Sequence, residues 1–397
     1  MLSSTRASDF PNSPDRPLRI EMVLPCLDVG GMEMLALAMA RSLTSRGHEV
    51  GITCIEREGE LADAARADGL RVSVAPALGV RTLVRAPGLA SHFARLRPDV
   101  VHTHNGAWEK GAGAARAAGV PVVGNTFHGI NGGEPWYFPR LLNLGARRSD
   151  WVVPVSEHLR TFLHERARVP LAKLHVLING VDTERFQPSA ERRTLRARMG
   201  LDERHLVVAI VARLVPLKSH ALLLDAFARV QHDVPNARLA IVGDGELRAD
   251  LNARIDALGL RDRVQMLGSL RDLDTVYRDI DVFVLPSTME GTSMSVLEAM
   301  ASGACVVASA VGGTPNLLAD GACGVLFPSG DVAALADGLR AVLRDRARRE
   351  ALAAAARARV VEHFSLDAML DGYERLYRGA PAPRHHLSSS EIVSCAG

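Results

Sequence analysis

Short apolar runs alternate with longer amphipathic stretches along most of the chain. The first series begins at residues 18–24 (LRIEMVL) and 49–55 (EVGITCI), continues with DVVHTH, PVVGNTF and WVVPVS, and closes with KLHVLING near Gly180. Valine, leucine and isoleucine stand on both faces of these runs, and helical patterns such as MEMLALAMARSLTSRG separate them. Strands that are buried on both faces and joined by helices have this pattern. We therefore predict a parallel sheet covered by helices on both sides.

A second series of the same kind fills the other half of the chain. It opens with HLVVAIVARL at 205–214 and ARLAIVGDG at 237–245, followed by RVQMLGS, DVFVLPS, ACVVASAVGG and GVLFPS. The polar, proline-containing segment NGVDTERFQPSAERR separates the two series. The fold class is thus α/β, with two doubly wound parallel-sheet domains in tandem that face each other across a cleft.

The pattern also sets the domain boundaries. We expect an N-terminal domain over 17–185 and a C-terminal domain over 186–365. A helix over 366–379 (LDAMLDGYERLYRG) could pack on either domain, and a return to the N-terminal domain is one arrangement. The Ser/Pro-rich ends, 1–16 and 380–397, are expected to be disordered.

Composition narrows the class of protein. A chain of 397 residues with 47% hydrophobic and 23% charged residues suits two globular domains, and a net charge of +2 argues against a nucleic-acid binder. The five cysteines are scattered without a C-x-x-C spacing, so neither a disulfide framework nor a zinc site is indicated. With no signal-peptide h-region and no run of about 18 apolar residues, we expect a cytoplasmic protein.

Two carboxylates follow the strand expected at DVFVLPS. The stretch MEGTSMSVLEAMASG holds Glu290 and Glu298, eight positions apart. Ligands bind at the carboxyl ends of parallel strands, where two acids could each accept paired hydrogen bonds from vicinal hydroxyls of a sugar nucleotide. Alternatively, Ser295 and Glu298 fit the S-x-x-E capping box, in which Glu298 only caps its own helix and Glu290 is an ordinary loop acid.

Basic and glycine-rich segments also follow predicted strands. Arg213 and Lys218 come just after the first strand of the second domain, where a guanidinium and an ammonium suit a diphosphate, unless they are solvated surface charges. Gly30 and Gly31 lie between the first strand and the first helix and could bring backbone amides to an anion, or simply form a tight turn.

A dinucleotide fingerprint is absent from both glycine-rich segments. In IVGDGELR the third glycine position is Arg248, which makes a dehydrogenase a weak interpretation. Gly243 and Gly245 are therefore better read as structural than as ligand-binding residues.

Histidine and aspartate clusters are candidates for metal sites. His102 and His104 alternate at the end of one strand and His128 follows another, but no further ligand at suitable spacing accompanies them. The D-x-D triplets Asp272–Asp274 and Asp279–Asp281 occur in the loop of one class of sugar transferases, yet here they flank a helix and a strand. The structural interpretation is favoured for all of them, and no metal site is predicted.

A basic bias marks the segment 140–173, and it has two interpretations. The basic side chains could seat the protein on an anionic membrane that carries a lipid-linked acceptor, or they could be solvated helix faces, which we favour. They are Arg140, Arg147, Arg148, Arg160, Arg166, Arg168 and Lys173.

These segments, taken in order, resemble the retaining GT-B glycosyltransferases of glycosyltransferase family 4 (group 1 glycosyl transferases). The resemblance rests on the E-x7-E segment with its LEAMASG continuation and on GGMEMLALAMARSLTSRGHEV, PDVVHTHN, INGVDTERFQP, VARLVPLKSHALLLDAF and AVGGTPNLLADGACGVLFP. It extends from about Leu18 to Tyr377. It implies a GT-B fold of two Rossmann-like domains and a metal-independent transfer with retention.

The resemblance also implies roles for particular residues. Gly30 and Gly31 would offer amides to the diphosphate or the sugar, and Arg213 and Lys218 would neutralise the leaving nucleoside diphosphate. Glu290, Gly291 and Thr292 would contact the donor sugar, Glu298 the ribose, His128 the sugar near the reacting carbon, and Ser269 and Leu270 the base. Two positions depart from the family pattern, namely Thr292 after EG and Asn316 after the proline of GGTPNLL.

The resemblance thus implies transfer of a hexosyl unit from a nucleoside-diphosphate sugar to a saccharide or lipid-linked acceptor, in surface polysaccharide or glycolipid biosynthesis. No cofactor is expected beyond the donor, for which a UDP-sugar is favoured over a GDP- or ADP-sugar. The expected place is the cytoplasm, with peripheral contact to the inner face of the plasma membrane as an option. The alternatives are a GT-B-shaped sugar-nucleotide epimerase and a non-catalytic nucleotide-sugar-binding protein.

Overall fold

The computed structural model describes residues 16–77, 79–83, 85–130, 134–191 and 193–382. The two expected tails lie almost entirely outside these ranges. The chain forms two compact units: unit 1 takes in the described residues up to Asn179 together with those from Leu366 onward, and unit 2 comprises Gly180–Ser365.

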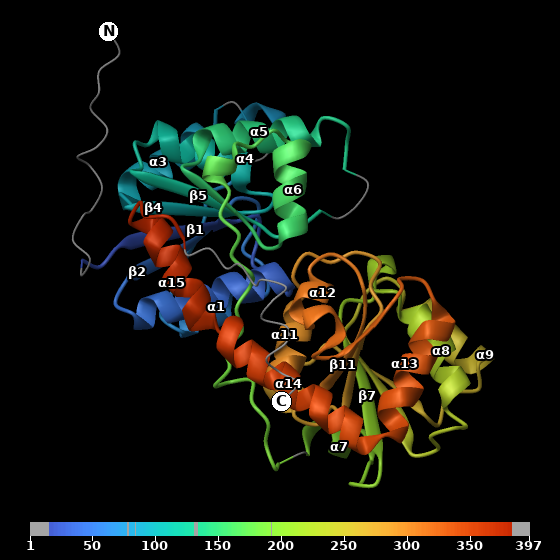
Figure 1. Ribbon diagram of the computed structural model, residues 1–397. Coiled ribbons are helices and arrows are strands. Elements are labelled where there is room, and N and C mark those ends of the chain that lie inside the picture. Colours follow the sequence, from blue (N-terminus) through green and yellow to red (C-terminus); the bar gives the residue numbers. More distant parts are fainter. Residues whose placement is uncertain (1–15, 78, 84, 131–133, 192, 383–397) are drawn as a thin grey trace. The chain divides into compact units, whose positions relative to one another are not determined.

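Unit 1 is built on a six-stranded parallel sheet with the strand order β3-β2-β1-β4-β5-β6 (Figure 1). In chain order its strands are β1 (Arg19–Leu24), β2 (Glu49–Cys54), β3 (Arg71–Val74), β4 (Val100–His104), β5 (Val122–Phe127) and β6 (Trp151–Pro154). Its helices are α1 (Gly31–Ser45), α2 (Ala62–Ala67), α3 (Pro87–Leu96), α4 (Trp108–Ala117), α5 (Phe138–Arg148), α6 (Glu157–Glu165) and α15 (Leu366–Tyr377), with short 3-10 turns at Val80–Leu83 and Leu171–Lys173.

Helices cover both faces of the unit 1 sheet. In Figure 1, α3, α4 and α5 lie on one face, and α1 and α15, which contact each other, lie on the other. The side chains of Val101 and His102, which are adjacent in β4, point to opposite faces of the sheet. Every residue of β4 and β5 is buried. This burial on both sides explains why these strands read as continuous apolar runs.

Unit 2 repeats the architecture with the strand order β12-β11-β10-β7-β8-β9, again all parallel. The strands are β7 (Leu206–Val211), β8 (Ala237–Val242), β9 (Val264–Gly268), β10 (Val282–Leu285), β11 (Cys305–Ser309) and β12 (Val325–Phe327). The helices are α7 (Thr194–Met199), α8 (His220–Val230), α9 (Arg248–Ala257), α10 (Leu273–Tyr277), α11 (Met294–Ala301), α12 (Thr314–Leu317), α13 (Val332–Arg344) and α14 (Arg346–His363), with 3-10 turns at Pro216–Lys218 and Ala319–Gly321.

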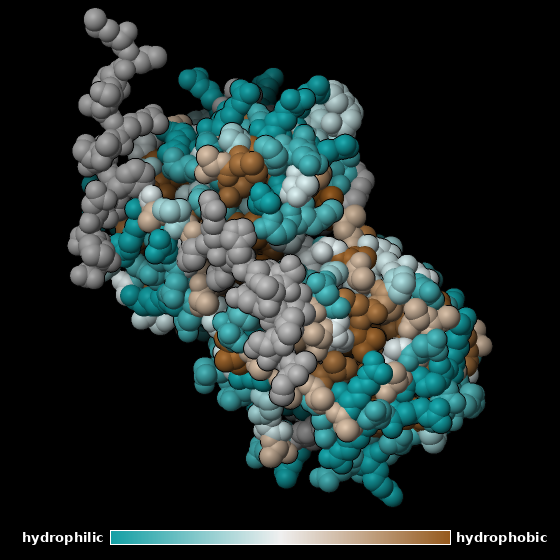
Figure 2. Space-filling model, in the orientation of Figure 1, coloured by the Kyte–Doolittle hydropathy of each residue, from teal (hydrophilic) through white to brown (hydrophobic). Residues whose placement is uncertain are grey.

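The core of unit 2 follows from strand alternation. Val208 and Ile210 of β7 pack into one apolar cluster with residues of α8, α9 and α13, whereas Val207 and Ala209 are buried toward the opposite face, where α11 and α14 contact each other. On the side seen in Figure 2 most surface residues of both units are hydrophilic, and the apolar ones form smaller patches. Most apolar residues are therefore buried between the sheets and the helices that cover them.

One segment that was expected to be a strand is not one, and one strand of unit 1 was not expected. The segment KLHVLING is not a strand: only Leu174 forms a single bridge, to Val152 of β6. The sixth strand of unit 1 is instead β3, with the sequence RVSV. It is a short edge strand with polar residues at alternate positions, so its pattern is weak.

Candidate active site

The strongest candidate site in unit 2 lies where the strand order reverses. From β7 the chain proceeds through β8 to β9 on one side and then returns to β10 on the other side of β7. The loops that leave the carboxyl ends of β7 and β10 therefore diverge, and this is the position at which open α/β sheets bind ligands. Thr288 N donates to the Leu217 carbonyl over 2.9 Å and ties the two loops together.

Lys218 and Glu290 meet at this point. The Lys218 ammonium donates to Glu290 Oε1 over 2.5 Å, and the two side chains are 22% and 9% exposed. Lys218 ends the 3-10 turn after β7, and Glu290 stands in the loop after β10. The carboxylate thus holds the ammonium at the edge of the sheet, and the remaining exposure leaves the ammonium reachable from solvent.

Arg213 lies in the same loop as Lys218 and is exposed. Within the part of the chain that the structure describes, its guanidinium makes no hydrogen bond or ion pair. The pair Arg213 and Lys218 therefore presents positive charge at the carboxyl end of β7, as an anionic ligand would require.

The loop that carries Arg213 is supported from below by Gly243 and Gly245. A Cβ on Gly243 (φ 137°) would lie 2.0 Å from the Ala212 carbonyl oxygen, and one on Gly245 (φ 157°) would lie 2.6 Å from that of Leu214. These glycines let the β8 loop pack against the β7 loop, which gives both of them a structural role.

A second close approach fixes the loop of Glu290, Gly291 and Thr292. Gly313 N donates to the Gly291 carbonyl over 2.9 Å. A Cβ on the neighbouring Gly312 (φ 55°) would overlap the Glu290 carbonyl oxygen at 1.7 Å. The GG pair after β11 thus clamps the backbone of the acidic loop. Asn316 is exposed in α12, and its carbonyl accepts from Arg359.

Glu298 does not cap its helix. The N-cap of α11 is Ser293, whose hydroxyl accepts from Val296 N, so the capping box built on Ser295 is wrong. Glu298 lies in the second turn with its side chain only partly exposed. Burial raises the pKa of its carboxyl to about 7, and the nearby Tyr277 hydroxyl and Arg185 guanidinium oppose this only in part.

Ser269 and Leu270 follow β9, at the same edge of the sheet as Lys218 and Glu290. Ser269 is exposed and Leu270 is half-buried.

The aspartate triplets have structural roles. Asp272 is the N-cap residue of α10, and Asp274 pairs with Arg185 and Arg278. Asp279 is fully buried and accepts from Leu195 N (2.5 Å) and Arg196 N (3.0 Å) at the start of α7.

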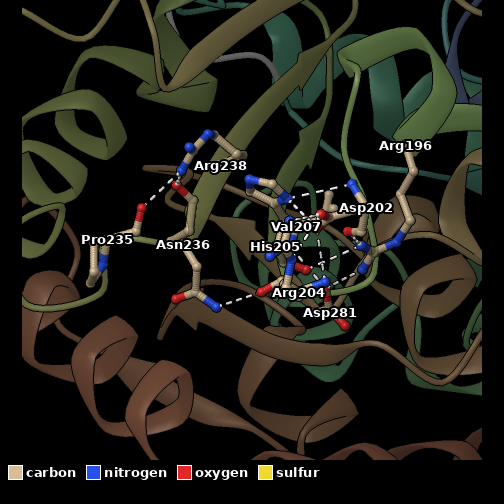
Figure 3. Close-up of polar contacts among 10 residues, drawn as sticks. Arg196, Asp202, Arg204, His205, Val207, Pro235, Asn236, Arg238 and Asp281 are labelled. Atoms are coloured by element: carbon tan, nitrogen blue, oxygen red, sulfur yellow. Dashed lines mark hydrogen bonds and ion pairs between the residues drawn. The ribbon is translucent and has the colours of Figure 1, made fainter.

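Asp281 also has a structural role, at the amino ends of the strands of unit 2. It accepts from Arg196 Nη2 (2.9 Å) and Val207 N (2.7 Å), within the polar cluster at the amino end of β7 that Figure 3 shows. Asp281 is therefore remote from the carboxyl end of the strands. Among the described residues there is no group of three or more His, Cys, Asp or Glu side chains that could hold a metal ion.

In unit 1 the strand order reverses between β1 and β4. Gly30 is the N-cap residue of α1 and has no side chain to cap it. The Glu33 carboxylate folds back over this position, because a Cβ on Gly30 would lie 2.3 Å from Glu33 Oε2. The amino end of α1 near Gly30 and Gly31 therefore already faces a negative charge.

His102, His104 and His128 of unit 1 form a row at the carboxyl ends of β4 and β5. His104 Nδ1 lies 2.9 Å from His128 Nε2, and the His104 ring stacks on that of His102 with centroids 4.5 Å apart. Burial lowers the pKa of His102 and of His128 to about 3, and it also lowers the pKa of His104 well below its ordinary value. All three imidazoles are neutral at physiological pH.

Two tyrosines of helix α15 make hydrogen bonds at the His102 end of this row. The Tyr377 hydroxyl lies 2.9 Å from His102 Nδ1, and the Tyr373 hydroxyl lies 2.7 Å from Thr126 Oγ1, which in turn bonds His102 Nε2 at 2.7 Å. Sequence reasoning missed these partners. The only signal was a pair of tyrosines four apart in GYERLY, on one face of the predicted helix.

Asn105 is a further residue that sequence reasoning missed. Its side chain accepts from His128 N (2.9 Å) and donates to the Gly129 carbonyl (2.7 Å), so it fixes the turn that carries His128.

The basic segment 140–173 is in part structural. Lys173 donates to the carbonyls of Ala146 and Ser149 at the end of α5, and Arg148 donates to those of Leu83 and Glu109. None of the helices within the described ranges has both the length and the hydropathy to cross a bilayer.

Comparison with known proteins shows to which family the chain belongs. Residues 29–185 match the profile described as "Glycosyltransferase Family 4", and residues 191–359 match "Glycosyl transferases group 1". A GDP-mannose-dependent alpha-(1-6)-phosphatidylinositol monomannoside mannosyltransferase of Mycobacterium tuberculosis is 31% identical over 379 residues, which cover 89% of this chain and 96% of the relative. The chain belongs to glycosyltransferase family 4.

Two further similarities bear on this glycosyltransferase. The UDP-Gal:alpha-D-GlcNAc-diphosphoundecaprenol alpha-1,3-galactosyltransferase of Escherichia coli is 27% identical over 88% of this chain and 94% of the relative. The crystal structure of Anabaena HepE in complex with UDP and glucose superposes with a TM-score of 0.80, at 22% identity, over 90% of this chain and 99% of that one. The predicted GT-B fold is confirmed.

Proposed function

We propose that this glycosyltransferase moves a hexosyl unit, with retention and without a metal ion, from a nucleoside-diphosphate sugar to a saccharide or lipid-linked acceptor. The observation that carries the proposal is the Lys218–Glu290 pair at the strand-order reversal of unit 2, beside the exposed guanidinium of Arg213. The named relatives are both transferases, and neither is an epimerase.

Different residues of unit 2 bind different parts of the donor. Arg213 and Lys218 take the diphosphate, and their charge stabilises the leaving group as the sugar–phosphate bond breaks. One such preorganised donor is worth about 3 kcal/mol in the transition state. Glu290, with Gly291 and Thr292, takes hydroxyls of the hexose, and Glu298 takes the ribose diol. Ser269 and Leu270 meet the base.

The carboxylates position the donor, and the chemistry proceeds through the leaving group. A glycosidase needs two carboxylates as acid and nucleophile. A sugar nucleotide already carries a good leaving group, and the departing diphosphate can accept the proton of the attacking hydroxyl. The family resemblance adds Gly30, Gly31 and His128 of unit 1 to the residues that contact the donor.

For the donor we favour a UDP-sugar, with GDP- and ADP-sugars as alternatives. The name of the E. coli relative specifies UDP-Gal and that of the M. tuberculosis relative specifies GDP-mannose, so related chains use different bases. Both of these relatives have lipid-linked acceptors by name. Assembly of a surface polysaccharide or glycolipid is the corresponding role.

A thermal-shift panel with UDP, GDP and ADP, each with and without EDTA, tests the donor site. Ligand at 100 times its Kd stabilises the folded state by about 2.7 kcal/mol, which raises the melting temperature by a few degrees. We expect UDP to raise it regardless of EDTA. A shift that EDTA abolishes contradicts the metal-free site, and no shift with any nucleotide contradicts the donor site. The anomeric configuration of a transferred sugar, read by NMR, tests retention.

A further inference from the structure

The row of histidines in unit 1 contains a hydrogen bond whose direction the surroundings decide. His104 is the last residue of β4, His128 follows β5, and the two rings lie nearly parallel, at 16°. In the 2.9 Å contact between His104 Nδ1 and His128 Nε2 one nitrogen must carry the hydrogen and the other must accept it. Because both rings are neutral, each ring has one N–H group.

The second nitrogen of His104 determines which ring donates. His104 Nε2 is buried and has no hydrogen-bond partner among the described residues. If Nε2 carried the hydrogen, a buried N–H group would be left without an acceptor, which is rarer in proteins than an acceptor without a donor. The hydrogen of His104 therefore belongs on Nδ1, from which it is donated to His128 Nε2.

The acceptor role of Nε2 fixes the remaining nitrogen of His128. Its hydrogen must lie on Nδ1, and no described residue bonds that nitrogen. The backbone of His128 is meanwhile held by Asn105, and the His128 side chain is partly exposed. The N–H group of His128 is thus held in a fixed place and is open to a ligand.

The contact with His128 favours the observed orientation of the His104 ring. His102 stacks on His104 and is itself bonded at both nitrogens, by Tyr377 and Thr126. A flipped His104 ring would place a carbon atom against His128 Nε2 and lose the 2.9 Å contact.

We propose that His104 is a positioning residue that fixes the tautomer of His128, so that His128 offers Nδ1–H as a hydrogen-bond donor to an oxygen of the transferred sugar. This inference rests on the proposed function for the identity of the ligand. It assigns His128 the role of a donor, and it excludes His128 Nδ1 as a general base.

The tautomer is read from long-range 15N–1H NMR spectra of the full chain at about pH 8, where imidazoles are neutral. Two histidines of the same protein serve as references. His164 Nδ1 lies 3.0 Å from the Val169 carbonyl oxygen, which can only accept, so His164 shows the Nδ1–H pattern. His48 Nδ1 accepts from Leu18 N over 3.1 Å, so His48 shows the Nε2–H pattern.

We expect the His128 signal, assigned by its loss in His128→Gln, to match the His164 pattern. In His104→Leu it should move toward the His48 pattern, whereas His104→Asn, whose amide can donate from nearly the same place, should keep it. The kcat of sugar transfer should fall at least tenfold in His104→Leu and largely recover in His104→Asn, with the KM for donor little changed.

The matched control is His92→Leu, which removes another buried imidazole of unit 1, one bonded to Thr53 and Ser73. It should leave both the His128 tautomer and kcat unchanged. An Nε2–H pattern for His128 in the unaltered protein overturns the inference, even if His104→Leu fails to fold. The spectra need no turnover, so a protein that shows the expected tautomer but transfers no sugar overturns the proposed function and leaves the tautomer assignment standing.

Discussion

If Glu298 binds the ribose diol, as we propose, this single residue makes donor binding depend on pH. An ionised carboxylate has two oxygens to accept both hydrogens of a ribose diol, whereas a protonated carboxyl has lost part of that capacity. The pKa of Glu298 is raised to about 7, so its protonation changes in the range where assays are run. Donor affinity should therefore follow the ionisation of this group.

We predict that the affinity for a UDP-sugar falls roughly tenfold from about pH 8 to pH 6, because Glu298 is mostly ionised at the higher pH and mostly protonated at the lower. Isothermal titration calorimetry measures the effect, and a UDP-sugar is used because its diphosphate diester does not titrate in this range. Glu298→Gln should bind weakly at every pH. Equal affinity of the unaltered protein at both pH values contradicts the ribose role.

The ion pair of Lys218 and Glu290 and the ligand-binding role that we propose for these two residues can be tested separately. Lys218→Met leaves the Glu290 carboxylate, 9% exposed, without its cation, and we expect a loss of about 2 kcal/mol in unfolding free energy together with weak UDP binding. Lys218→Met combined with Glu290→Gln should restore most of the stability but not the affinity for UDP. Urea unfolding and calorimetry measure the two effects.

The matched control for this pair is Arg254→Met, which breaks the exposed ion pair between Arg254 and Asp225. Surface pairs contribute about 0–1 kcal/mol, so this variant should lose little stability and no affinity. If Lys218→Met binds UDP as well as the control does, Lys218 has no role at the diphosphate.

At the scale of elements, helix α15 is attached to unit 1 by two kinds of contact. At the surface, Arg46 after α1 pairs with Asp367, Asp371 and Glu374. Beneath them, the Tyr373 and Tyr377 hydroxyls reach the buried Thr126 and His102. The surface ion pairs are screened by salt, whereas the buried bonds are not, so the tyrosines carry more of the attachment.

Tyr377→Phe should destabilise unit 1 by about 1–3 kcal/mol, because His102 Nδ1 is left buried without a partner. Tryptophan fluorescence during urea unfolding reports on unit 1 alone, since Trp108, Trp136 and Trp151 all lie within it. Tyr137→Phe is the control, because Tyr137 is 45% exposed and its hydroxyl makes no described contact. An equal effect of the two substitutions contradicts the anchoring role of Tyr377.

At the scale of the whole molecule, most of the residues that we propose for the donor site belong to one unit. Arg213, Lys218, Glu290 and Glu298 all belong to unit 2. We predict that UDP slows amide hydrogen exchange at 206–218, 264–270 and 282–301 while β2, β3 and β6 of unit 1 exchange as before. Mass spectrometry of peptides measures this, with uridine as the control ligand that lacks the diphosphate. Protection spread evenly over both units contradicts the assignment.

The sequence predicts the fold well because buried parallel strands carry their own signal. Both six-stranded sheets were expected, and only the edge of unit 1 was wrong, where β3 is short and KLHVLING imitates a strand with one bridge. The sequence also predicts that Lys218 and Glu290 lie at the same edge of the sheet, because each follows a parallel strand and the carboxyl ends of parallel strands lie together.

The contacts that refine the site cannot be read from sequence in the same way. The distance from His104 to His128, the clamp of Asn105 on the His128 turn and the reach of Tyr377 to His102 join residues 24, 23 and 275 positions apart. Each depends on strand register and ring orientation, which local periodicity does not specify. The same holds for the N-cap of α11, where the sequence favours Ser295 because Glu298 follows three residues later, and the structure has Ser293.

The return of α15 to unit 1 has a consequence for how the protein is made. The segment Gly180–Ser365 lies in the chain between unit 1 and α15. At a translation rate of about 5–20 residues per second, roughly 10–40 s pass between the synthesis of β6 and that of α15. During this interval α1 already lies on the face of the nascent sheet that carries His102 and Thr126, but the two tyrosine partners that α15 brings to these residues are missing. Unit 2 can therefore fold on the ribosome first, although its residues are made second, and unit 1 reaches its final structure only after unit 2 has been synthesised.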